Sequence, residues 1–242
     1  MSVATAKMCT YGVGGYSRIR KQFNIPIAEM EGVKEKLAKI AENNYKLVAA
    51  QNLFNAIVDN GEKPPVLSAI MKYKCTEYGR ESVNHGMDIL GGAGICKGPM
   101  NFLASNYIAT PVAITVEGSN TLTRSLIIFG QGLNRSHPHL LNIITSIENN
   151  NKVDFHKHFY NIINHTLTNL IKSLYYSFYA KIYRKTDFLD YYQVHLNRHV
   201  ANFAFSANVA LLMGGKIKTA EYISGRYADI LSDIYIDRKS VV

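Results

Sequence analysis

The residues after Pro26 repeat their apolar side chains every three or four positions, and this periodicity limits the chain to a largely helical fold. Such spacing places the apolar side chains on one face of a helix with 3.6 residues per turn. The helix is expected to end near 59–61, where Asp, Asn and Gly follow one another, and a second helix to open at 64–65 and run toward Leu90. The apolar positions of the first helix are Met30, Val33, Leu37, Ile40, Leu47, Phe54 and Ile57.

Glycine and proline mark where the other helices begin and end. A helix rich in small residues is expected over about 3–21, and the glycine-rich run 91–99 is expected to interrupt the helical pattern. Residues 112–116 are expected to form a short extended piece, followed by a helix from about Ser119. With few strand signals, the predicted class is all-α. A change in the character of the sequence after residue 132 indicates a boundary near 137–152, so the expected domains are residues 1–140, a helical bundle, and 141–242, an additional helical region.

Composition excludes several classes of protein. The net charge of +9 is spread along the chain rather than gathered in a tail, which argues against a nucleic-acid-binding protein. A diffuse positive charge suits a polyanionic small ligand or an anionic membrane surface, and equally a merely soluble basic surface. Three cysteines without CxxC spacing indicate neither a disulfide framework nor a zinc site, and fit a reducing cytoplasm. No uninterrupted apolar stretch reaches about 18 residues, so a membrane span is not expected.

Three features have both a chemical and a structural interpretation. Glu117 precedes a predicted helix start, where a carboxylate acts either as a general base or, more commonly, as a stabiliser of the helix dipole. Gly91 and Gly92 follow a helix, and form either its C-cap or a stretch of backbone that a phosphate can approach closely. Arg20 belongs to a basic run that is either a solvated helix end or a clamp for a pyrophosphate.

The histidines do not form a recognisable metal-binding pattern. His195 and His199 have the spacing of metal ligands on a helix, but Leu, Asn and Arg stand between them where a metalloprotease helix has glutamate. The remaining histidines near the predicted domain boundary lack cysteine or carboxylate companions at ligand spacing. The sequence therefore predicts no metal site.

The order of three motifs is more specific than any one of them. YSRIRKQFNIPI at 16–27, MDILGGAGI at 87–95 and VEGSNTLTR at 116–124 resemble, in type, order and separation, the C-terminal domain of the acyl-CoA dehydrogenase family. Further stretches, among them GEKPPVLSAIMKYKCT and GRYADILSDIY, are similar to the large FadE-type bacterial subgroup, whose members carry an extra helical region after the dehydrogenase core. The resemblance extends over about residues 5–236.

The resemblance implies FAD-dependent oxidation of a fatty acyl-CoA to a trans-2-enoyl-CoA, the first step of fatty acid β-oxidation. In the family, the glutamate at the position of Glu117 removes the substrate's α-proton while a hydride passes from the β-carbon to the flavin. The RxQF and QxxGG motifs reach the FAD of a neighbouring subunit, and the residues after the glutamate contact the flavin. The implied cofactor-binding residues are Arg20, Gln22, Phe23, Asp88, Gly91, Gly92, Ser119 and Thr121.

Three positions depart from the family pattern. Asp88 replaces the usual glutamine and so exchanges an amide donor for a carboxylate, while Val116 replaces tyrosine and Asn24 replaces glycine. The family also places a helical and a β-barrel-like domain before this one, and neither is recognisable here. The chain is therefore expected to be a C-terminal fragment. The alternative is a catalytically inactive fragment that acts as a helical interaction module.

The same resemblance implies the partners and the location. The expected partners are a fatty acyl-CoA substrate, an electron-transfer flavoprotein as electron acceptor, and either a second copy of the chain or an N-terminal half. Nucleic acid is not expected. The location is expected to be cytoplasmic, with peripheral association with the inner membrane of a bacterium through the basic C-terminal helices as a further expectation.

Overall fold

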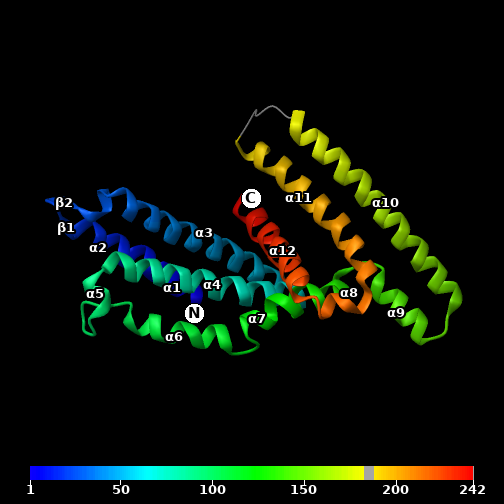
Figure 1. The fold of residues 1–242 in the computed structure, drawn as a ribbon, viewed down its shortest axis with the longest axis horizontal. Helices are drawn as coiled ribbons and strands as arrows, with labels where there is room; N and C mark the ends of the chain where they lie inside the picture. The colour runs from blue at the N-terminus through cyan, green and yellow to red at the C-terminus, as the bar shows by residue number, and fades with distance from the viewer. Residues whose placement is uncertain (183–187, 242) are drawn as a thin grey trace. The chain divides into compact units, whose positions relative to one another are not determined.

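A computed structural model describes residues 1–182 and 188–241, and almost all of this backbone is helical (Figure 1). Within the described part, strand structure is confined to a short antiparallel hairpin of β1 (Lys21–Gln22) and β2 (Ile25–Pro26). The predicted all-α class is confirmed. The chain divides into two compact units, residues 1–64 with 70–120, and residues 65–69 with those from 121 onward.

The two longest helices of the first unit are limited by glycine and proline, as predicted. The longest helix ends at a turn in which Gly61 has a φ of 81°. Pro64 precedes the next helix and Pro65 is its first residue, a position where the missing N–H of proline leaves no hydrogen bond unmade. The elements are α1 (Ser2–Met8), η1 (Cys9–Val13), α2 (Gly14–Ile19), η2 (Ile27–Glu29), α3 (Glu31–Asp59), α4 (Pro65–Leu90), α5 (Gly92–Ile95) and α6 (Ala104–Thr115).

An apolar core joins the helices of this unit. A Cβ placed on Gly86 of α4 would lie 2.6 Å from Cδ1 of Leu103, so only glycine permits the observed approach. The amide of Asn43 on α3 donates to the carboxylate of Glu81 on α4 at 3.0 Å, which ties these two helices together at a polar edge. The buried core residues are Cys9, Val13, Ile27, Ile40, Val83, Ile89, Leu90 and Leu103.

The extended piece predicted at 112–116 is wrong, because residues 112–115 belong to α6 and Val116 caps its end. The prediction relied on Pro111 and on the β-branched residues after it, which favour strands. The helix nevertheless continues through Pro111, and two threonine hydroxyls bind carbonyl oxygens around it: Thr110 donates to Asn106 O at 2.6 Å, and Thr115 to Pro111 O at 2.9 Å. Proline has no backbone N–H and so removes one helical hydrogen bond, but the helix here has two additional hydrogen bonds from threonine side chains.

The second unit is also helical. Phe129 is buried at its centre and stacks on Tyr227, with ring centroids 4.4 Å apart. The long helices α10 and α11 lie side by side (Figure 1). The elements are η3 (Thr123–Gln131), α8 (Gly132–Ser136), α9 (Leu140–Glu148), α10 (Lys152–Ile182), α11 (Phe188–Ala210), η4 (Leu211–Lys218) and α12 (Glu221–Val241), and α7 (Asn120–Leu122) contains the point where the units divide. Along the sequence, the main division between the compact units falls between residues 120 and 121. The family-domain division at residue 140 stays a prediction.

One helical stretch of the described chain, Leu189–Lys218, has the length and hydropathy of a membrane span. A single stretch of this kind is weak evidence of a span, because the core helices of soluble proteins pass the same test of length and composition.

Candidate functional site

The RxQF residues lie on the hairpin between α2 and α3. Arg20 leads into β1, Gln22 belongs to β1, and the turn residues Phe23 and Asn24 have φ values of 53° and 65°. Two successive positive φ values are typical of the type I′ turns that join two-residue hairpins. Asn tolerates this conformation better than most residues, so Asn24 fits a position where the family has glycine. Phe23 is 89% exposed at the tip of the hairpin.

The second motif lies where α4 ends. Gly91 is the C-cap of α4, with φ 57° and ψ −127°, a combination that side chains disfavour. A Cβ on Gly91 or Gly92 would meet no atom within 4 Å, so the backbone here borders open space. The C-cap interpretation is correct, and the same glycines leave the backbone accessible to a ligand.

The fold brings these two motifs together at one end of the first unit, where Figure 1 shows β1, β2 and α5 close to one another. They line a single open cavity of 1330 Å³. Ligand clefts usually enclose roughly 300–1,000 Å³, so this one accommodates a large ligand. The predicted cofactor residues in its lining are Arg20, Gln22, Asp88, Gly91 and Gly92, and the lining also includes Lys21 and Lys36.

Asp88 forms an ion pair with Lys36 in this lining. The Nζ of Lys36 lies 2.8 Å from Oδ2 of Asp88, and the two side chains are 39% and 59% exposed. Since the pair faces water it adds little to stability. The ion pair does change the charge of the cavity, because Lys36 neutralises the carboxylate of Asp88, which stands where the family has glutamine. Arg20, Lys21 and Lys36 leave this cavity with an excess of positive charge, which fits the diphosphate of FAD.

Glu117 lies in a different place, in the exposed turn between α6 and α7. Its φ is 57° and that of Gly118 is 94°, so two successive residues have left-handed backbone. Lys72 of α4 binds this turn, and its Nζ donates to Gly118 O at 2.6 Å. Lys72 and Asp88 are 16 residues apart on α4, about 24 Å at 1.5 Å per residue. The predicted base and the cavity are therefore far apart within one chain.

The remaining predicted residues follow Glu117. Ser119 is exposed in the same turn, and Thr121 is exposed where the longer segment of the second unit begins. Ser119, Thr121 and the exposed Phe23 are outside the lining of the cavity, which holds the other five predicted cofactor residues. Lys36 and Lys72 were missed by the sequence interpretation, because each is one lysine on a long helix and its partner lies at least 42 residues away.

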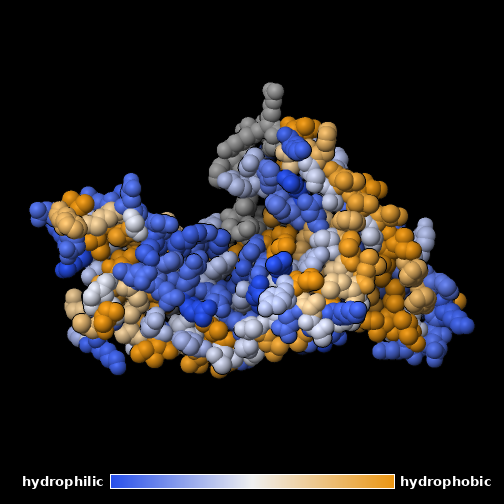
Figure 2. All heavy atoms as spheres, in the orientation of Figure 1, coloured by the Kyte–Doolittle hydropathy of each residue, from blue (hydrophilic) through white to orange (hydrophobic). Residues whose placement is uncertain are grey.

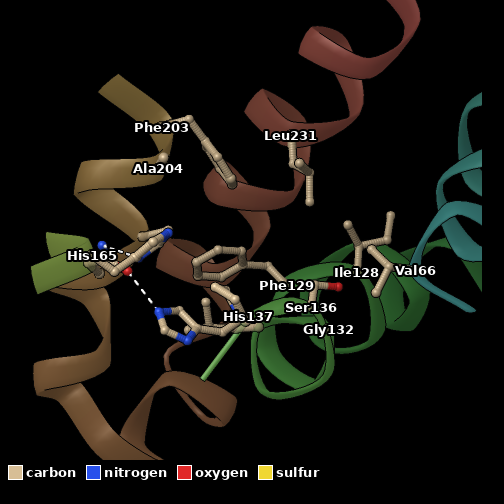
Figure 3. A pocket seen from close by; sticks show the side chains of 14 residues that line it. Val66, Ile128, Phe129, Gly132, Ser136, His137, His165, Phe203, Ala204 and Leu231 are labelled. Carbon is tan, nitrogen blue, oxygen red and sulfur yellow. Dashed lines mark hydrogen bonds between the residues drawn. The ribbon is translucent and has the colours of Figure 1, made fainter. Parts of the chain in front are cut away.

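A separate apolar pocket of 150 Å³ lies in the second unit (Figure 3). Phe129, Phe203 and Leu231 come to it from three helices, and Figure 3 shows the dashed hydrogen bonds of His137 and His165 at its edge. The Nδ1 of His137 accepts from the backbone N–H groups of His139 and Leu140, both at 3.2 Å. Its Nε2 must therefore carry the proton that it donates to Oδ1 of Asn208 at 3.0 Å.

Burial lowers the pKa of His137 most, and the neighbouring rings of His165 and His139 lower it as well, whereas the hydrogen bond that His137 donates to Asn208 raises it. The neutral ring is favoured, so His137 serves as a structural cap for α9. In the part of the chain that the structure describes, no three His, Cys, Asp or Glu side chains are placed to hold a metal ion. This pocket contains none of the predicted site residues.

Two protein-family models match this chain, one over its N-terminal part and one over its C-terminal part. Residues 1–130 match the model of the acyl-CoA dehydrogenase C-terminal domain, and residues 134–240 match that of the bacterial-type acyl-CoA dehydrogenase C-terminal region. A 3-(aryl)acrylate reductase of Clostridium sporogenes (strain ATCC 15579) is 39% identical over 85 residues, which cover 34% of this chain and 22% of that protein.

A crystal structure of an acyl-CoA dehydrogenase complexed with FAD, from Bacillus anthracis, superposes with a TM-score of 0.75 at 19% identity. The match covers 99% of this chain and 40% of the other, so this chain spans less than half the length of the proteins it matches. With one family model covering residues 1–130 and a second covering most of the remainder, the chain belongs to the FAD-dependent acyl-CoA dehydrogenase family.

Proposed function

We propose that this chain supplies the catalytic base and part of the FAD-binding surface for the oxidation of fatty acyl-CoA to trans-2-enoyl-CoA, the first step of fatty acid β-oxidation. The observation that carries the proposal is the cationic cavity of the first unit, in which residues from two separated motifs, Arg20 with Gln22 and Asp88 with Gly91, meet. Residues that fit a diphosphate cofactor are thus combined, on one helical domain, with an exposed glutamate in the position of the family's base.

The proposed reaction breaks two C–H bonds and forms one C=C bond. The α-proton goes to the carboxylate of Glu117, and the electrons of the α C–H bond form the new double bond as a hydride leaves the β-carbon. FAD, when bound, supplies the hydride acceptor. A carboxylate in water is a weak base toward a thioester α-proton, so Glu117 must be positioned and shielded from solvent to act. Within this chain, the Glu117 turn provides the position.

The test is an assay of the whole FAD-loaded enzyme with a fatty acyl-CoA and an artificial electron acceptor. Enoyl-CoA should appear in proportion to acceptor reduced. A flavin-loaded enzyme that forms no enoyl-CoA would refute the proposal and favour the alternative of a catalytically inactive interaction module. The 3-(aryl)acrylate reductase relative bears a name that denotes the opposite direction, so the same enzyme should also be tested with an enoyl-CoA and a reductant.

The separation of the cavity from Glu117 favours a homo-oligomer as the working form. Lys72, which binds the Glu117 turn, and Asp88, which lines the cavity, lie about 24 Å apart along α4. One chain would therefore contribute its base to one flavin and its cavity to the flavin of a second copy. Cross-subunit contacts of this kind are what the RxQF and QxxGG motifs imply. An electron-transfer flavoprotein is proposed as the acceptor of the electrons that the reaction releases.

The exposed face of α10 supports a further proposal, that the second unit binds an anionic membrane surface. Figure 2 shows the apolar surface over the region of α10. Four exposed lysines, Lys152, Lys157, Lys172 and Lys181, stand on this helix against a single acidic residue, Asp154. A basic helix with a broad apolar face suits the boundary between lipid headgroups and acyl chains. The exposed apolar side chains, 44–78% accessible, are Val153, Phe159, Tyr160, Ile163, Leu167, Ile171, Leu174, Tyr175, Phe178 and Ile182.

Changing Ile171 and Leu174 together to Ser should weaken vesicle binding by at least about tenfold, because each buried aliphatic side chain contributes roughly 1.5–3 kcal/mol. Cosedimentation with phosphatidylcholine vesicles that contain phosphatidylglycerol measures the effect. The control is Ile108→Ser on α6, which removes an equally exposed side chain elsewhere and should leave binding unchanged. Wild-type chain that remains in the supernatant at low salt would contradict membrane association and leave the cytoplasm as the proposed location.

A further inference from the structure

We propose that Lys72 is a positioning residue for the proposed base, because it holds the turn that carries Glu117 in its left-handed conformation. The inference rests on the proposed function. Lys72 lies on α4 and its ammonium group reaches the turn from the side. It acts through the backbone around Glu117 and makes no hydrogen bond to the Glu117 carboxylate among the contacts described.

The ammonium group binds both sides of the turn at once. Nζ of Lys72 donates to Ile114 O at 3.0 Å, in the last turn of α6, and to Gly118 O at 2.6 Å, directly after Glu117. A third bond, of 2.6 Å, goes to Oδ1 of Asn120, the first residue of α7. These three acceptors match the three donors of an ammonium group. Lys72 therefore fixes the position of Glu117 from both directions along the chain.

The turn needs such support because its backbone is unfavourable. Glu117 has a φ of 57°, a region in which residues other than glycine and asparagine are uncommon. A strained conformation persists only where the surroundings determine it, at a cost of about 1–3 kcal/mol. The carbonyl end of α6 also carries partial negative charge, which a cation stabilises. Both effects assign the same role to Lys72.

A second contact to α4 strengthens the first. Nδ2 of the buried Asn120 donates to Oγ1 of Thr76 at 2.8 Å and to Oε1 of Glu77 at 2.7 Å. Thr76 is four residues after Lys72 and so lies on the same face of α4. Asn120 thus accepts from one turn of α4 and donates to the next, and the start of α7 cannot shift without breaking charge-assisted hydrogen bonds.

The electrostatic environment of Lys72 agrees with this role. Burial lowers the pKa of Lys72, whereas the negative charges of Glu77 and Glu117 raise it. Lys72 is therefore partly desolvated and close enough to Glu117 for their charges to interact. Removing the ammonium group would take away the support of the turn and a cation beside the base together.

Lys72→Met is expected to lower kcat by about 10- to 100-fold, since a displacement of the order of 1 Å at a reacting group has effects of this size. FAD content should change little, because Lys72 does not line the cofactor cavity. With an α-deuterated acyl-CoA, the isotope effect on kcat should rise, because proton removal by a displaced base becomes slower. A defect of folding alone lowers the active fraction and leaves the isotope effect unchanged. Lys74→Met removes a lysine that faces Tyr73 and Tyr78 and serves as the matched control.

Hydrogen exchange of residues 115–120 tests the same inference without activity. Exchange in this segment should be about tenfold faster in Lys72→Met than in Lys74→Met. Should Lys72→Met fail to fold, Lys72→Gln, which retains two donors, replaces it in both measurements. An active wild-type enzyme whose Lys72 variant keeps its kcat, isotope effect and exchange rates would overturn the inference. An inactive wild-type enzyme with faster exchange in the variant would instead overturn the proposed function alone.

Discussion

Glu117→Gln is expected to lower the rate of dehydrogenation by about 10²- to 10⁴-fold, the range that a general base contributes. Glutamine has nearly the same shape as glutamate but does not accept a proton at neutral pH. The substitution therefore removes the base without removing the side chain, and the turn held by Lys72 should keep its conformation. Flavin content should be unchanged, because Glu117 lies outside the cavity of Arg20 and Asp88.

The effect is measured by single-turnover reduction of the bound flavin with a fatty acyl-CoA, which isolates the chemical step. Glu62→Gln, an exposed glutamate in the segment between α3 and α4, removes the same charge and is the control, with no change expected. If Glu117→Gln reduces its flavin as fast as wild-type enzyme, the base is another residue and the assignment to Glu117 is wrong.

Phe129→Ala is expected to lower the free energy of unfolding of the second unit by about 3–5 kcal/mol, the usual cost of removing a buried aromatic side chain. Phe129 is 1% exposed. Its ring stacks on Tyr227 and meets the edge of Phe203, with ring centroids 4.4 and 6.1 Å apart. Truncation would enlarge the apolar pocket that Phe129 lines and leave both aromatic neighbours without their central partner.

Urea denaturation followed by far-UV circular dichroism measures this change, with two transitions allowed because the chain has two compact units. The control is Phe178→Ala on α10, where the ring is 67% exposed and a loss below about 1 kcal/mol is expected. Equal denaturation midpoints for Phe129→Ala and wild type would mean that the stacking of Phe129 on Tyr227 contributes nothing to the stability of the second unit.

The sequence predicted the fold where local chemistry decides it. Pro65 and Gly91 limit α4 as expected, because each has a conformational preference that needs no tertiary partner. The prediction failed at 112–116. The β-branched residues there favour a strand, but α6 continues through Pro111, and the hydroxyl group of Thr115 donates a hydrogen bond to the carbonyl oxygen of Pro111. The type of helix could not be predicted from the sequence either, because no residue pattern distinguishes the π-helical η1 and η3 from α-helix.

The candidate site divides in the same way. Arg20 and Asp88 are named by their motifs, and the fold places both in one cavity, although their roles toward FAD stay predictions. Lys36 and Lys72 have no motif, because their importance depends on partners 42 to 52 positions away in the chain. Pair contacts across a helical bundle depend on how helices rotate against each other, which periodicity alone does not determine.

The hairpin tip carries a consequence for how this domain evolves. Phe23 has a φ of 53°, and the residue is 89% exposed. Both its backbone conformation and its contact with water lower the stability of the free domain. Glycine at that position would relieve both. Selection for stability alone would therefore remove Phe23, and its retention agrees with the proposed contact to FAD. Other residues are expected at this position in relatives that have abandoned the reaction.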